Sequence, residues 1–193
     1  MRMREVDALC SKIDRLLERE KYVCVAIDGH AAAGKTSLAA YLKSRYDCNT
    51  IHMDHFFLRP EQRTSERLAQ PGGNVDYERF KAEVQEPLLA GMPFAYHPFN
   101  CRTGDFDAKV NITQKQLAIV EGAYSLHPTL MDVYHIKVFL TISPEEQLRR
   151  IEARDGEKLL ERFQTEWLPM EHRYFETCNI PQGCDFIFGE ELA

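Results

Sequence analysis

The 193-residue sequence lacks long apolar runs, and its longest clean run extends only from Tyr22 to Ile27. A transmembrane helix needs roughly 20 consecutive apolar residues, so the sequence predicts no membrane-spanning segment. Residues 1–20 mix charged and apolar side chains and contain no apolar core of a secretory signal. We therefore expect a cytoplasmic protein without a membrane partner.

The chain also lacks a cysteine framework and an excess of basic residues. Its six cysteines are scattered and form no C-x-x-C pair, which argues against a disulfide scaffold and against a zinc site. Lys and Arg number 24 against 30 for Asp and Glu, a formal net charge of -6. A protein that binds nucleic acid needs a broad basic face, so we expect no nucleic-acid partner. A small phosphorylated ligand stays compatible, because a few local cations are enough to bind it.

Short apolar segments alternate with helical patterns along the chain. Buried parallel strands are predicted where apolar residues fill both faces, at residues 22–27, 49–53, 116–122, 136–142 and 184–188. Helices are predicted where apolar residues recur at helical spacing, before residue 20, after Lys35, at 80–91, at 143–155, and from 157 to beyond a kink at Pro169. This alternation is typical of an α/β fold with a mostly parallel central sheet and helices on both faces. We expect one domain over residues 1–193.

The predicted N-terminal helix has an apolar face made of Val6, Leu9, Ile13, Leu16 and Leu17. Such a face packs either on its own domain or against a second copy of the chain. The sequence therefore leaves a homo-oligomer open.

The strongest functional signal lies between the first strand and the helix that follows it. This segment reads Gly29-His30-Ala31-Ala32-Ala33-Gly34-Lys35-Thr36, followed by Ser37, and matches G-x-x-x-x-G-K-[ST] in full. In such a phosphate-binding loop, or P-loop, glycines let the backbone wrap closely and its N–H groups converge on nucleotide phosphates. Lys35 is expected to reach the β- and γ-phosphates, and the Thr36 hydroxyl to ligate Mg²⁺. The sequence thus predicts a P-loop NTPase, a three-layer sandwich with a small lid, that binds ATP and Mg²⁺.

The rest of the sequence and the length of the chain narrow the class of P-loop protein. No N-K-x-D segment, which would recognise guanine, is present, and the chain is short for a motor or an assembly ATPase. A small-molecule kinase is the simplest remaining class. We take ATP as the nucleotide by default. No residue that would contact the nucleotide base can be recognised in the sequence, so the choice between ATP and GTP is not a deduction.

Two acidic residues follow strands that are expected to lie near the P-loop. Asp54, in the segment HMDHFF, fits the base that orients or deprotonates an acceptor hydroxyl in a kinase, and it equally fits an N-cap or a solvated turn. Glu121 ends the strand at 116–122, where a carboxylate commonly holds Mg²⁺, and the alternative is a helix cap.

Arginines follow the helix start at Ser143. Arg149, Arg150 and Arg154 suit a lid that neutralises charge on a transferred phosphoryl group, and we assign residues 149–162 to this lid region. The alternative is an exposed helix face on which arginines are only solvated.

Residues 58–75 are rich in proline and glycine and have little periodicity. We predict a long functional loop, and not a domain linker, that builds the acceptor site. A phosphorylated acceptor would need basic residues there, and the loop arginines available for it are Arg59, Arg63, Arg67 and Arg102. Loop arginines more often face solvent, so the charge of the acceptor stays open.

Together these segments resemble the uridine kinase-like branch of P-loop kinases, which includes phosphoribulokinase, bacterial-type pantothenate kinase and nicotinamide riboside kinase. The resemblance covers residues 23–188 and is carried by DGHAAAGKTSLA, MDHFF, NVDYERF, AIVEGAYSLHP, KVFLTISPEEQLRRIEARD and CDFIF. It implies ATP- and Mg²⁺-dependent phosphoryl transfer to a hydroxyl of a small molecule, with a nucleoside as the first candidate. It further implies the following roles: Asp54 as catalytic base, Asp76 on ribose hydroxyls, Phe57 and Tyr96 lining the acceptor site, Glu121 with Mg²⁺, and Lys35, Arg150 and Arg154 on the transferring phosphoryl group. From the residues alone, Asp76 equally caps a helix and Tyr96 is equally an ordinary strand residue.

The chain departs from uridine kinases at two places. The lid has GEKLL at 156–160 instead of an S-E-R-G-R stretch, with Lys158 or Arg162 as candidate substitutes, and Cys101 stands where the family has a histidine. Both departures concern pyrimidine recognition. The acceptor therefore stays open between a nucleoside, another ribosyl compound such as nicotinamide riboside, pantothenate and a sugar phosphate. A P-loop regulator or ATPase without a small-molecule acceptor is the second class, and it would have no use for Asp54.

Overall fold

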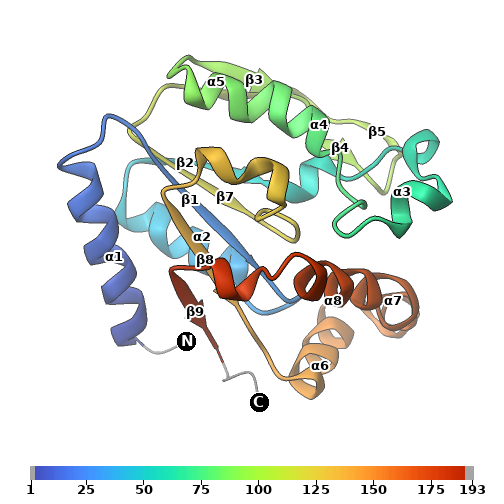
Figure 1. Cartoon of the computed structure of the whole chain (residues 1–193). Helices are drawn as coiled ribbons and strands as arrows, with labels where there is room; N and C mark the ends of the chain where they lie inside the picture. Colours follow the sequence, from blue (N-terminus) through green and yellow to red (C-terminus); the bar gives the residue numbers. More distant parts are fainter. Residues whose placement is uncertain (1–2, 190–193) are drawn as a thin grey trace.

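Five short strands pair in parallel to form the central sheet of the protein, whose computed structural model describes residues 3–189. The order across the sheet is β2 (Cys48–His52), β7 (Leu117–Glu121), β1 (Val23–Gly29), β8 (Ile136–Leu140) and β9 (Phe186–Phe188) (Figure 1). All five strands coincide with the predicted segments to within a few residues. Because the strands are parallel, their carboxyl ends meet at one edge of the sheet, where ligands bind in such folds.

Both faces of the sheet are covered, which confirms the predicted three layers. Alternate residues of β1 point to opposite sides: Val23, Val25 and Ile27 pack with α1 (Met3–Leu17) and α2 (Lys35–Arg45). Cys24 and Ala26 pack on the other side, with the helices formed by residues 77–89 and 168–177. The apolar face of α1 is buried against its own sheet, which decides between the two packings that the sequence left open for this helix.

The segment between β2 and β7 covers one face and extends beyond the carboxyl edge of the sheet. One continuous helix comprises α4 (Tyr77–Phe80), the π-helical turn η3 (Lys81–Gln85) and α5 (Glu86–Leu89). Two small antiparallel pairs follow, β3 (Phe94–Tyr96) with β6 (Val110–Ile112) and β4 (Phe99–Asn100) with β5 (Asp105–Phe106).

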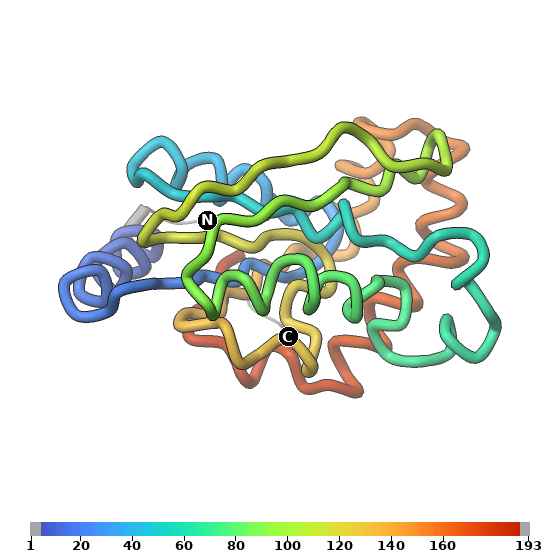
Figure 2. The backbone as a smooth tube through the Cα atoms, turned by 90° about the horizontal axis from the view of Figure 1, so that it is seen from above, coloured from blue at the N-terminus to red at the C-terminus, as the bar shows by residue number. Residues whose placement is uncertain are grey.

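The prediction for residues 58–75 was wrong in one respect, because this segment is partly helical. It contains the 3-10 turn η2 (Pro60–Gln62) and the short helix α3 (Ser65–Ala69), whose N-cap Thr64 accepts a hydrogen bond from the Arg67 N–H. From above, the segment bends toward the C-terminal helices (Figure 2), and Arg173 donates to the Leu68 carbonyl at 3.4 Å. A second 3-10 turn, η1 (Met53–Phe56), leads into it from β2.

The C-terminal region comprises η4 (Pro128–Val133), α6 (Pro144–Asp155), α7 (Glu157–Arg162), the π-helical turn η5 (Phe163–Trp167), α8 (Leu168–Thr177) and the 3-10 turn η6 (Pro181–Gly183). The Ser143 hydroxyl caps α6 by accepting from the Glu146 N–H, as predicted. The expected kink at Pro169 was misplaced: the proline lies in the first turn of α8, and the irregular turn is η5 before it. No residue of α7 is buried, so its apolar side chains do not belong to the core. Across residues 3–189, the helices are all too short or too polar to traverse a bilayer.

A buried carboxylate holds the end of β1 to two other segments. Asp28 is fully buried, and its Oδ1 accepts from the N–H groups of Gly29 at 2.7 Å and Tyr124 at 3.2 Å. Its Oδ2 accepts from the Leu126 N–H and the Tyr174 hydroxyl, both at 2.9 Å. One side chain therefore connects the start of the P-loop, the segment after β7, and α8.

We predict that Asp28→Ala lowers the free energy of unfolding by about 3 kcal/mol or more, because it leaves buried donors without an acceptor. Tyr174→Phe removes one donor and should cost about 1 kcal/mol. Urea denaturation followed by circular dichroism measures both. The control is Asp47→Ala, because the Asp47 side chain is 87% exposed in its pair with Lys115. A loss in Asp28→Ala as small as in this control would contradict the assigned role.

Candidate nucleotide- and acceptor-binding site

A cavity of about 1070 Å³ lies at the carboxyl edge of the sheet. Its walls come from the P-loop, η1, the 58–75 segment, the β4–β5 hairpin, the end of β7, and α6 to α8. The predicted site residues that line it are Ala31, Ala32, Gly34, Lys35, Thr36, Ser37, Asp54, Phe57, Glu121, Arg150 and Arg154. The structure thus brings together most of the side chains that the sequence singled out.

The P-loop runs from β1 into α2 and depends on its two glycines. Gly29 has a φ of 131°, and a Cβ there would lie 2.1 Å from the Leu140 carbonyl oxygen, so β8 leaves no room for a side chain. Gly34 precedes α2 with a φ of 101°. The Lys35 ammonium reaches back over the loop and donates to the carbonyls of Gly29 at 2.6 Å and His30 at 2.8 Å.

His30 and Ala33 belong to the P-loop but are not among the cavity-lining residues. The His30 ring lies against Phe139 and Phe175, at centroid distances of 5.5 and 5.1 Å. Burial there lowers the pKa of His30 to about 4, so the ring is neutral at physiological pH. A role of His30 in nucleotide binding would thus involve its backbone.

Glu121, at the tip of β7, is buried and held by two partners. Its Oε2 accepts from the Thr36 hydroxyl at 3.2 Å, and its Oε1 contacts Nδ1 of His52. The parallel register places His52 of β2 directly opposite Glu121, and the hydrogen bond to Glu121 raises the pKa of His52. Sequence reasoning missed His52, although it stands two residues before Asp54.

The Thr36–Glu121 pair fits a magnesium site. Mg²⁺ prefers oxygen ligands and is commonly held by one or two carboxylates together with substrate phosphates and water, not by a dedicated protein cage. Residues 3–189 contain no group of three or more His, Cys, Asp or Glu side chains placed to hold a metal ion. A hydroxyl and a carboxylate beside the P-loop are the donors that this chemistry requires.

Asp54 lies in η1, between the P-loop and the acceptor side of the cavity. Its side chain is exposed toward the cavity, and desolvation by the surrounding protein atoms raises the pKa of Asp54. The charge of Glu121 raises this pKa further, while Lys35, His52 and Arg154 oppose the shift. No described residue donates a hydrogen bond to this carboxylate, which leaves it free for a ligand. Gly122 permits this arrangement, because a Cβ there would lie 3.0 Å from the Met53 Cβ.

The lid arginines divide into two groups. Arg150 lines the cavity, donates to the Ala32 carbonyl at 3.3 Å and pairs with Glu146 at 2.7 Å. Arg154 and Arg162 also line it, whereas Lys158 does not. Arg149 does not line the cavity; it is exposed and pairs with Glu146. This position agrees with the alternative given above, in which an arginine of this helix is only solvated.

Asp76 and Tyr96 are not among the cavity-lining residues. Asp76 is buried; its Oδ1 caps α4 by accepting from the Arg79 N–H at 3.0 Å, and its Oδ2 accepts from Gln62 Nε2 at 2.7 Å. Tyr96 is buried behind His55, with its hydroxyl 3.1 Å from the His55 Nδ1. The structure therefore gives both side chains internal partners, and their substrate-binding roles stay predictions.

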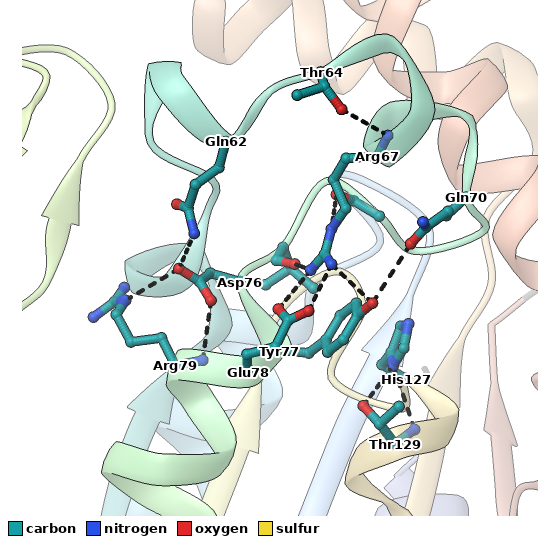
Figure 3. Close-up of polar contacts among 12 residues, drawn as sticks. Gln62, Thr64, Arg67, Gln70, Asp76, Tyr77, Glu78, Arg79, His127 and Thr129 are labelled. Atoms are coloured by element: carbon teal, nitrogen blue, oxygen red, sulfur yellow. Dashed lines mark hydrogen bonds and ion pairs between the residues drawn. The ribbon is translucent and has the colours of Figure 1, made fainter.

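One arginine of the 58–75 segment holds that segment in place (Figure 3). The Arg67 guanidinium binds both carboxylate oxygens of Glu78 at 2.6 and 2.7 Å, the Gly73 carbonyl at 3.1 Å and the Tyr77 hydroxyl at 2.8 Å. It also lies over the Tyr77 ring, which stacks on His127 at 4.3 Å. Arg67 is therefore a structural clamp on the acceptor side of the cavity.

A second pair of residues that sequence reasoning missed connects the lid helices to the P-loop. Glu171 of α8 accepts from the Ala31 N–H at 2.9 and 3.0 Å. Gln147 of α6 donates to the Ala31 carbonyl at 3.2 Å and to Glu171 at 3.3 Å. Burial raises the pKa of Glu171 to about 7, with the Lys35 charge acting in the opposite direction.

This shift predicts a pH-dependent effect of Glu171→Gln on stability. The folded state retains the Glu171 proton more strongly than the unfolded state, so the wild-type side chain stabilises the fold at low pH. This contribution is lost as the pH rises from 4.5 to about 7. The variant does not titrate at this position and should gain stability relative to wild type across that window. Urea denaturation over a pH series measures the difference, and a difference that is constant with pH would refute the shift.

Comparisons with known proteins agree on the fold. No protein-family model matches the chain, and a search of curated proteins found no match. Among solved structures, a possible uridine kinase from Bacillus stearothermophilus superposes with a TM-score of 0.71 at 18% identity, over 96% of this chain and 97% of that one. A proposed fructose transport system kinase from Silicibacter sp. TM1040 also gives 0.71, at 21% identity, over 95% and 98%. The chain thus has the three-layer α/β fold of these two structures.

Proposed function

We propose that the protein is a Mg²⁺-dependent kinase that transfers the γ-phosphoryl group of ATP to a hydroxyl of a small molecule. The observation that carries this proposal is the position of Asp54. Its carboxylate receives no hydrogen bond from the described residues, and the charges of Lys35, Glu121 and Arg154 all act on it. A nucleotide-binding regulator needs P-loop residues but has no use for a free carboxylate at this place.

In this proposal each group of site residues has a separate role in phosphoryl transfer. The P-loop N–H groups and the Lys35 ammonium bind the phosphates of ATP, and Thr36 and Glu121 hold Mg²⁺. When bound, Mg²⁺ neutralises charge on the phosphates. Asp54 orients the acceptor hydroxyl and accepts its proton. Arg150 and Arg154 stabilise the negative charge on the transferring group from the lid side.

A nucleoside is the first acceptor to test, because the sequence resembles uridine kinases and one structural neighbour is described as a possible uridine kinase. Cys101 lines the cavity where that family has a histidine, which keeps other acceptors open. The panel therefore comprises uridine, cytidine, nicotinamide riboside, pantothenate, ribulose 5-phosphate and glycerate.

The test is a coupled ADP-release assay with ATP and Mg²⁺ against this panel. We expect acceptor-dependent turnover that Asp54→Asn reduces by on the order of 100-fold or more, because proton transfer by a positioned base contributes that much. Asp132→Asn, an exposed change on η4, is the matched control. Binding of ATP to the Asp54→Asn variant should persist. ADP release that needs no acceptor and survives Asp54→Asn would instead identify an ATPase or a regulator.

A further inference from the structure

The arginines of the acceptor segment differ in what balances their charge. Arg59 pairs with Glu61 at 3.2 Å, and Arg67 pairs with Glu78 at 2.6 Å. Arg63 lines the cavity, is half-buried, and donates from Nη1 to the Asn74 Oδ1 at 3.1 Å. Asn74 is neutral, and no Asp or Glu of the described residues forms an ion pair with Arg63. Its charge is therefore uncompensated inside the cavity.

The acidic residues of the cavity wall are engaged elsewhere. Glu121 is bound to Thr36 and His52, and Glu171 to the Ala31 N–H. Asp107 accepts from the neutral Asn100 side chain at 3.2 and 3.3 Å and forms no ion pair with Arg63. Asp54, which carries no such bond, is the acceptor base of the proposed reaction. No carboxylate of the cavity is thus assigned to Arg63.

The partner of Arg63 lies in a closely packed turn. Asn74 is only 7% exposed and follows Gly72 and Gly73. A Cβ on Gly73 would lie 2.0 Å from the Arg67 carbonyl oxygen, and one on Gly72 would lie 2.5 Å from the His127 ring. Arg67 also donates to the Gly73 carbonyl at 3.1 Å, so the position of Asn74 is defined by packing and by the Arg67 clamp.

A second arginine of the cavity wall, Arg162 at the end of α7, has a carboxylate partner. It pairs with Glu166 at 3.0 Å and lies over the Trp167 ring at 4.8 Å. Burial raises the pKa of the Cys101 thiol, which also lines the cavity, while the charges of Arg63 and Arg162 oppose this shift. Among these two arginines, Arg63 is the one without a carboxylate partner in the described residues.

We propose that Arg63, which lines the cavity and is bound by the neutral side chain of Asn74, binds an anionic substituent of the acceptor. A guanidinium binds carboxylate and phosphate oxygens in a two-pronged geometry, and Arg63 keeps donors beyond the one that Asn74 uses. The inference rests on the proposed kinase activity and narrows its acceptor to small alcohols that carry a phosphate or a carboxylate. Neutral nucleosides lack this group and serve as the comparison.

The test measures binding separately from turnover. The chain has one tryptophan, and Trp167 lines the cavity, so its fluorescence reports ligands there. Titrations use Mg²⁺ and a saturating non-hydrolysable ATP analogue, which fills the P-loop, at constant ionic strength. The probes are inorganic phosphate and two matched pairs: ribulose 5-phosphate with ribulose, and glycerate with glycerol. The first pair reports a phosphate group and the second a carboxylate.

We expect inorganic phosphate to bind, and we expect at least one of ribulose 5-phosphate and glycerate to bind. The affinity of that anionic ligand should exceed the affinity of its neutral partner by about tenfold or more. Arg63→Gln should abolish this preference, and Asn74→Asp should weaken it by supplying Arg63 with a carboxylate. Arg59→Gln, in the same segment but outside the cavity lining, should retain it. Circular dichroism checks that each variant is folded. The proposal is overturned if no anionic probe is preferred, or if Arg63→Gln and Arg59→Gln behave alike.

Failure of this proposal and failure of the kinase activity give different results. An Arg63-dependent preference for anions without acceptor-dependent ADP release would retain the anion site and reject the kinase. Acceptor-dependent ADP release with uridine, unchanged in Arg63→Gln, would retain the kinase and reject the anion site.

Discussion

The buried carboxylate of Asp28 is the interaction on which the arrangement of the site depends. It accepts hydrogen bonds from the first residue of the P-loop, from the backbone after β7, and from Tyr174 of α8. A carboxyl group without these partners would be costly to bury, so its hydrogen bonds favour this arrangement of the three segments. The same contacts that satisfy Asp28 therefore also fix where the P-loop begins relative to the tip of β7.

The position of the tip of β7 then determines the reactive end of the cavity. Parallel pairing places His52 opposite Glu121, and the chain turns from His52 directly into η1, which carries Asp54. From the other side, α2 presents Thr36 to Glu121 at 3.2 Å. Gly122 lets η1 approach closely, since any side chain there would meet Met53. The candidate base and the candidate metal ligands thus lie at the same edge of the sheet, because the parallel strands β1, β2 and β7 all end there.

Features set by local sequence were the ones that could be predicted. The apolar runs of β1, β7 and β8, the P-loop glycines and the Ser143 cap each depend on a few neighbouring residues, and the structure confirms them. The carboxylates Asp54 and Glu121 were found because strand ends are recognisable and meet at one edge. The helix α3 was missed because its five residues lie among prolines and glycines, with no periodicity to reveal them.

Features set by distant contacts could not be predicted. The bond from Glu171 to the Ala31 N–H spans 140 residues, and nothing in the α8 sequence distinguishes this glutamate from its exposed neighbours. The cap that Asp76 provides to α4 was one of the alternatives that the sequence left open. The bond from Gln62 to Asp76, and the exposure of the apolar residues of α7, likewise depend on how separate elements pack. Phosphorus NMR of a mixture of the protein, ATP, Mg²⁺ and the acceptor panel tests the central claim most directly, because it shows where the γ-phosphoryl group goes. The account predicts ADP and a new phosphomonoester signal from an acceptor; ADP and inorganic phosphate alone would contradict it.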